Sequence, residues 1–159
     1  MKNSVLIKVA LIVSCLQTCG LANAESTNAD KSAETISYYT ELIGALDQTT
    51  IGGVRKKAVY LSVIVRRESE LNGFDSAYKI TKQIKSHIPA CESVGHMEYC
   101  ETIYHSSLGR LYADYGKHNE AKPELKKALS LFEKHIVLYD ENALYKEVKG
   151  YYEAITKSN

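Results

Sequence analysis

The chain has 159 residues, which is a typical length for a single domain. Apolar residues make up 45% of it and charged residues 25%, with 20 basic residues against 19 acidic ones. This balance excludes the strongly basic surface that nucleic-acid binding requires. Only two prolines occur, and good helix formers are abundant, so the composition favours helices.

The first 24 residues have the pattern of a secretory signal peptide. Lys2 and Lys8 supply positive charge, and residues 9–16 form an apolar core that is too short to span a bilayer. Small residues at 22 and 24 predict cleavage after Ala24, with export to the periplasm or out of the cell. Loss of the two lysines would leave 18 basic and 19 acidic residues, a net charge of −1.

A lipid anchor is the alternative to cleavage after Ala24. Residues 12–15 read Ile-Val-Ser-Cys and resemble a lipobox that ends at Cys15. Lys8 lies close to it and would leave a very short apolar core. We therefore expect the cleaved, exported form.

After a flexible start at residues 25–31, the sequence predicts one helical domain over residues 32–159. The apolar periodicity gives six helices, at about 32–47, 54–71, 76–87, 97–115, 119–139 and 142–157. Ser32 is expected to cap the first helix, and Asp140 or Asn142 the last. Pro89 is expected to close the third helix.

An internal repeat is visible over residues 102–135. Small and apolar residues stand where two helices of a hairpin would meet or turn, namely Leu108, Gly109, Tyr112, Gly116, Ala121, Leu125 and Ala128. Gly109 and Ala121 would allow a close helix crossing, and Gly116 a tight turn. On a 34-residue frame this pattern strongly resembles the tetratricopeptide repeat, although Glu133 replaces the family's usual proline.

A looser copy of the repeat covers residues 58–91. Ala77 falls at the small position and Pro89 at the family's proline position. Val65 stands where Gly109 stands in the other copy, which predicts a wider crossing. The resemblance implies an all-α fold of antiparallel hairpins in a right-handed superhelix, with the first and last helices as caps.

The resemblance also implies a binding surface. In tetratricopeptide proteins the first helix of each repeat lines a concave face, and the matching positions here include Ser62, Arg66, Ser69, Glu70, Ser106, Arg110 and Asp114. Arg66 and Arg110 share one repeat position, so both could enter one groove and hold a carboxylate or an acidic segment. Alternatively, each pairs with an acid one turn away, Glu70 or Asp114.

Cys91 and Cys100 lie between Pro89 and Thr102, where the frame has about ten extra residues. In an oxidising compartment a disulfide is the default for such a pair. His96 and His105 make zinc an alternative, although the spacing fits no zinc-finger pattern, and free thiols are a third. We expect no cofactor and no metal.

No nucleophile elbow, zinc-protease motif or phosphate loop occurs in the sequence. We therefore expect a binding module for a protein or peptide, not an enzyme, with no nucleic-acid partner and no membrane span. An immunity or inhibitor protein against an envelope-acting toxin is the alternative, and a metal-binding protein the third. One member of each tyrosine pair, 38–39 and 151–152, is expected to face outward as a contact candidate.

Overall fold

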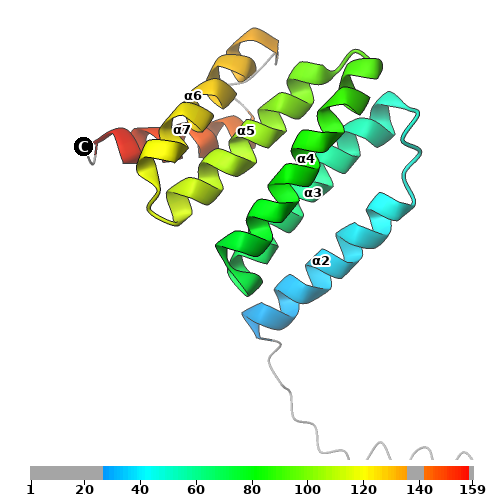
Figure 1. Ribbon diagram of the computed structural model, residues 1–159, viewed down its shortest axis with the longest axis horizontal. Helices are drawn as coiled ribbons and strands as arrows, with labels where there is room; N and C mark the ends of the chain where they lie inside the picture. Colours follow the sequence, from blue (N-terminus) through cyan, green and yellow to red (C-terminus); the bar gives the residue numbers. More distant parts are fainter. Residues whose placement is uncertain (1–26, 136–141, 158–159) are drawn as a thin grey trace, which may run out of the picture.

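The computed structural model describes residues 27–135 and 142–157, and this part of the chain is all-helical. Its helices are α2 (Asn28–Gly44), α3 (Ile51–Asn72), α4 (Phe74–Ser93), α5 (Met97–Asp114), α6 (His118–His135) and α7 (Ala143–Lys157). Helices α2 to α6 each pack against the next along the chain, and α7 lies across α5 and α6 (Figure 1). The all-α prediction is confirmed.

Several sequence predictions fall outside the described residues. These are the signal peptide with its cleavage after Ala24, the alternative anchor at Cys15, the end of the fifth helix near Tyr139, and Asp140 as a cap. The other proposed cap of the last helix, Asn142, is described: its Oδ1 accepts hydrogen bonds from the backbone N–H groups of the first turn of α7, at 2.9 and 3.2 Å.

The first helix begins earlier than predicted. Thr27 forms a capping box with Asp30, which satisfies free N–H groups of the first turn and starts α2 at Asn28. Ser32 is not a cap, because it lies inside the helix, is buried, and donates a hydrogen bond of 3.0 Å to Glu70 on α3. The predicted flexible start is therefore wrong over residues 27–31.

The third predicted helix does not end at Pro89. Helix α4 continues through this exposed proline to Ser93, so residues 90–93 are helical and not a linker. The following turn is well anchored, since the N–H of His96 donates to the carbonyl of Cys91 at 2.8 Å, and Gly95 adopts φ +75°. A proline inside a helix removes one hydrogen bond and crowds the carbonyl four residues earlier, yet the helix continues for a further turn to this anchored end.

The predicted disulfide between Cys91 and Cys100 is confirmed. Both cysteines are fully buried, their Cα atoms are 6.3 Å apart, and the bond joins the last turn of α4 to the first turn of α5. The two sulfur atoms are bonded to each other, so they are not available as zinc ligands. Within residues 27–135 and 142–157, no group of three or more Cys, His, Asp or Glu side chains is placed to hold a metal ion.

The core follows the predicted repeat positions. Leu108, Ala77, Ala121 and Ala128 are buried, and Gly116 has φ +68° in the turn before α6. A Cβ added at Gly109 would lie 2.8 Å from side-chain atoms of Leu125 and 3.0 Å from its backbone nitrogen. Helices α5 and α6 therefore approach closely at Gly109, as predicted.

Tyr112, the aromatic residue of the frame, is half-buried at the junction of the two hairpins. Its ring lies 5.9 Å from that of Phe74 and 6.3 Å from that of Tyr78, both on α4. Burial, followed by the hydrogen bond to Tyr78, raises the pKa of Tyr112 to about 12. This side chain therefore packs the first hairpin against the second.

Candidate functional site

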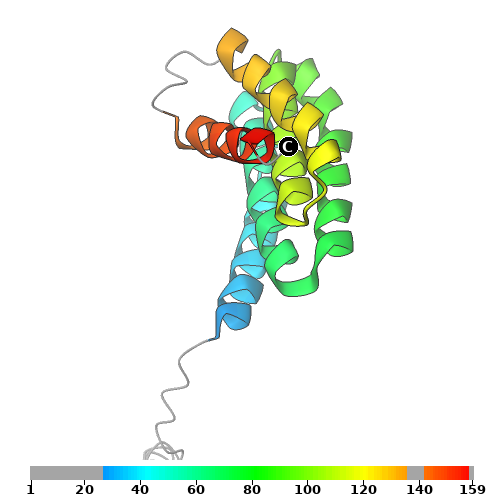
Figure 2. The same ribbon diagram turned by 90° about the vertical axis from the view of Figure 1, so that its left-hand side faces the viewer.

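A continuous groove runs between α3 and α5 and is closed at one end by α7. Figure 2 shows α3 and α7 on the side of the molecule opposite α4. The groove has two depressions, of about 400 Å³ and about 280 Å³, and both are lined by Val59 and Tyr99. Its walls thus come from two different hairpins, and its end from the C-terminal helix.

The groove gathers positive charge. Five of its lining residues are basic, and none of those lining the two depressions is acidic: the basic ones are Arg55, Lys56, Arg66, Arg67 and Arg110. The whole chain is nearly neutral, with 20 basic and 19 acidic residues. The fold therefore gathers basic side chains in one groove, which the nearly neutral composition does not reveal.

Arg66 and Arg110, predicted to enter one groove, meet at a single carboxylate. Nη1 of Arg110 lies 2.8 Å from Oε2 of Glu147 on α7, and Nη2 of Arg66 lies 3.5 Å from Oε1 of the same residue. Neither arginine pairs with an acid of its own helix. Glu70 instead accepts a hydrogen bond of 2.7 Å from Arg67, which is the main cause that lowers its pKa.

The two arginines differ in accessibility. The side chain of Arg110 is 13% exposed, and its Nε also donates to the carbonyl of Ser106 at 3.2 Å. The side chain of Arg66 is 58% exposed. Arg110 therefore serves mainly to hold α7, whereas Arg66 offers its guanidinium to solvent.

A polar contact beside this arginine pair completes the closed end. The hydroxyl of Tyr151 on α7 donates to Oδ1 of Asp114 at 2.7 Å. Burial, followed by this hydrogen bond and the charge of Asp114, raises the pKa of Tyr151 to about 12. Ser69 lines the same end. Arg110 and Asp114, both predicted to line the binding surface, thus hold helix α7.

The open end of the groove is aromatic and basic. The guanidinium of Arg55 lies over the ring of Tyr99, 4.1 Å from its centroid, in a cation–π arrangement. Tyr60 lines this end and contacts Tyr39 of α2, with ring centroids 5.1 Å apart. In the tyrosine pair 38–39, Tyr38 is therefore the outward member, at 58% exposure.

Not every predicted site residue reaches the groove. Ser62 lines it, but its hydroxyl donates to the carbonyl of Val59 at 2.7 Å. Ser106 is completely buried, and Glu70 does not line either depression but accepts hydrogen bonds from Arg67 and from Ser32 on α2.

The sequence reasoning also missed residues that do line the groove or reach into its end. Among them, Arg55 and Lys56 stand eleven residues before Arg66 and Arg67, which is three helical turns and places them on one face. That spacing could have predicted the second basic pair. No local pattern could have predicted Glu147, because its contact with the arginines depends on how α7 crosses the two hairpins.

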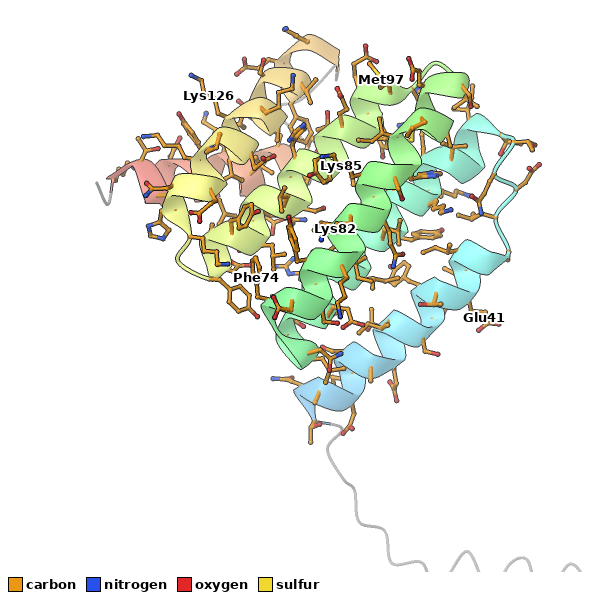
Figure 3. The ribbon with its side chains drawn as sticks, in the orientation of Figure 1. Glu41, Phe74, Lys82, Lys85, Met97 and Lys126 are labelled. Carbon is orange, nitrogen blue, oxygen red and sulfur yellow. A yellow bond between two sulfur atoms is a disulfide. The ribbon has the colours of Figure 1, made fainter. Side chains whose placement is uncertain are left out.

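The face opposite the groove carries exposed lysines. Figure 3 shows Lys82 and Lys85 along α4 and Lys126 on α6. His105 on this side pairs with Glu124 on α6, with 2.6 Å between Nδ1 and Oε2. These lysines belong to other helices than the basic groove residues, which makes them useful control positions.

Comparison with models of known protein families, with curated proteins and with solved structures finds no match to this chain. In the part of the chain that the structure describes, no helix has the length and apolar character needed to cross a membrane.

Proposed function

We propose that this chain is an exported binding module of tetratricopeptide-like fold, which holds an acidic segment of a protein or peptide partner in the groove between α3 and α5. One observation carries the proposal: five basic side chains line the groove and no acidic residue lines its two depressions. Guanidinium groups bind carboxylates through paired hydrogen bonds, so an acidic partner matches this surface.

The packing of the second hairpin supports the tetratricopeptide-like interpretation. Gly109 and the buried Ala121 and Ala128 occupy the small positions of the frame, and Gly116 forms the turn between α5 and α6. In the first hairpin, Ala77 is buried at the matching position. A repeat of this kind places its first helices, α3 and α5, side by side, and these helices provide the groove walls.

Several acidic groups are needed on the partner. An exposed ion pair contributes only about 0.2–1 kcal/mol, and salt screens it. A single carboxylate at Arg66 would therefore bind weakly, whereas a segment that also reaches Arg55 and Lys56 adds further contacts of this kind. Apolar residues in the groove, such as Val59 and Ile103, can add burial to this electrostatic attraction.

A charge-reversal experiment tests the proposal. The probe is a fluorescent glutamate-rich peptide, and its binding to the mature protein is followed by anisotropy at low salt. We expect Arg66→Glu with Arg67→Glu to weaken binding at least about tenfold, because each replacement turns attraction into repulsion. The matched control is Lys126→Glu with Lys127→Glu, the same charge change on exposed residues of α6.

The control should leave peptide binding almost unchanged. Equal loss in both double variants would show attraction by net charge alone and would contradict a groove. Circular dichroism of each variant confirms that the helices are intact.

Export is a separate part of the proposal and has its own test. The full chain is expressed with its N-terminal segment, and the protein is recovered from cell fractions. Cleavage after Ala24 predicts a periplasmic or secreted product whose N-terminus is Glu25. A lipid-modified product that begins at Cys15 would support the anchored form instead.

A further inference from the structure

The basic residues of α3 form two separate pairs. Arg55 and Lys56 line the open end of the groove, and Arg66 and Arg67 line the part next to α7. The two pairs are eleven residues apart, which is just over three helical turns, so they lie on the same face of α3. At a rise of 1.5 Å per residue, the pairs are separated by about 16 Å.

The surface between these pairs is largely apolar. Val59 and Val63 lie on the same face of α3, and Ile103 and the ring of Tyr99 face them from α5. Along its length the groove thus has basic charge, an apolar floor, and basic charge again. A partner that matches it must repeat this order with acidic charge at both ends.

The arginines next to α7 are not equally available, and Arg67 among them already donates to Glu70 at 2.7 Å. Arg110 is committed to Glu147 at 2.8 Å and is mostly covered. Arg66 is more than half exposed, and its contact with the same carboxylate is long, at 3.5 Å. A partner carboxylate therefore competes with Glu147 for Arg66, while Arg110 keeps α7 in place.

We propose that the groove takes an extended segment with acidic residues at two points about five positions apart and apolar side chains between them. This inference rests on the proposed function. An extended chain advances about 3.3 Å per residue, so about five residues span the 16 Å between the two basic pairs. The apolar side chains between the acids then lie over Val59 and Ile103.

A helical partner fits this groove less well. A helix needs eleven residues to span 16 Å, and with its side chains it is about 10 Å wide. Helix α7, whose Leu144 lines the larger depression, also limits the room at that end.

Labelled synthetic peptides test the spacing, and the first two of them have identical composition. The first carries two acidic pairs whose first members are five residues apart, with Val and Ser between them. The second has all four acids together, followed by the same Val and Ser residues. A third, alanine-rich peptide favours a helix and places its acidic pairs eleven residues apart. Anisotropy at about 0.15 M salt gives the affinities.

We expect the first peptide to bind about tenfold more tightly than the second, because only it reaches both basic pairs. In the variant Arg55→Glu with Lys56→Glu, this preference should disappear, while the second peptide still binds at Arg66. Lys56→Glu alone, at an exposed position, should reduce the preference without disturbing the Arg55–Tyr99 contact.

The other outcomes are decisive in different ways. Equal binding of the first two peptides to the wild-type protein would overturn the two-ended segment and leave the proposed function standing. Tightest binding of the helical peptide would overturn the extended conformation. Failure of every acidic peptide to bind would overturn the proposed function together with this inference.

Discussion

The hairpins α3–α4 and α5–α6 have corresponding arginines in different roles. Arg66 and Arg110 are predicted to share one repeat position, and both approach Glu147. In the second hairpin α7 covers the arginine, so that it becomes part of the structure. In the first hairpin α7 leaves the arginine exposed beside an open groove. The repeat position thus determines where a side chain points, and the neighbouring helix determines what it can do.

The same two hairpins differ in how closely their helices pack. Gly109 leaves no room for a side chain against Leu125, whereas Val65, at the matching position, is itself a buried core residue. The hairpin that carries the open part of the groove is therefore not the one with the closest helix crossing. The predictions below test this difference, from the largest expected effect to the smallest.

Gly109→Val should destabilise the protein by about 3 kcal/mol, because a Cβ there meets both the side chain and the backbone of Leu125. Chemical denaturation of wild type and variant measures the free energy of unfolding. The control is Gly150→Ala on α7, where no atom lies within 4 Å of the added Cβ. It should stabilise by about 0.5–1 kcal/mol, because alanine favours a helix.

Loss of stability in Gly150→Ala of the same size as in Gly109→Val would contradict the close crossing. Val65→Ala gives the complementary result for the first hairpin. It should also destabilise, but by leaving a cavity and not by a clash.

Removal of the disulfide should cost about 2–3 kcal/mol, since the bond closes a short loop in the unfolded chain. The variant Cys91→Ser with Cys100→Ser should therefore melt at a lower temperature than the oxidised wild type. Reductant should lower the melting temperature of the wild type towards that of the variant and leave the variant unchanged. An equal shift in both proteins would show that reductant acts elsewhere.

Arg110→Ala should destabilise by about 1.5–2 kcal/mol, because it leaves Glu147 without its shortest partner at a half-buried position. Arg66→Ala should change stability by less than about 0.5 kcal/mol, because its side chain is exposed and its ion pair is long. Urea unfolding of both variants provides the comparison. Similar losses would mean that the two arginines are equivalent.

The smallest effect is expected on acidification, in the first hairpin. Nε2 of His87 on α4 contacts the carbonyl of Val54 on α3 at 2.9 Å, and burial lowers the pKa of this histidine below its ordinary value of 6.5. Below pH 6.5 the unfolded chain takes up the proton more readily than the folded one, so stability falls as pH decreases.

His87→Gln should make the stability profile flatter below pH 6.5, because an amide can donate to the same carbonyl but does not titrate. Thermal melting between pH 5 and pH 8 would show the difference. Parallel profiles for wild type and variant would mean that His87 does not cause the acid dependence.

Much of the fold could be predicted because periodicity and turn residues are local signals. The spacing of apolar residues gave the helices, and Gly109 and Gly116 gave the crossing and the turn of the second hairpin. The predicted start of the first helix at Ser32 and the predicted end of the third at Pro89 were wrong. The observed ends depend on the capping box at Thr27 and on the anchored turn beside the disulfide, and these outweigh the average preferences of single residues.

The candidate site was only partly predictable. The convergence of Arg66 and Arg110 follows from the repeat frame, and the second basic pair, Arg55 and Lys56, repeats on one helical face. Two features lie beyond local reasoning. The burial of Ser106 depends on packing around α5, and the contact of Glu147 depends on a helix distant in sequence.

The disulfide also affects the groove, because it connects the two hairpins that form it. Cys91 and Cys100 join α4 of the first hairpin to α5 of the second, and the two groove walls belong to these two hairpins. The covalent link therefore restrains how far the two hairpins can move apart. Such preorganisation lowers the entropic cost of association. The oxidised protein should thus bind acidic peptides more tightly than the reduced one, even at temperatures where both remain folded.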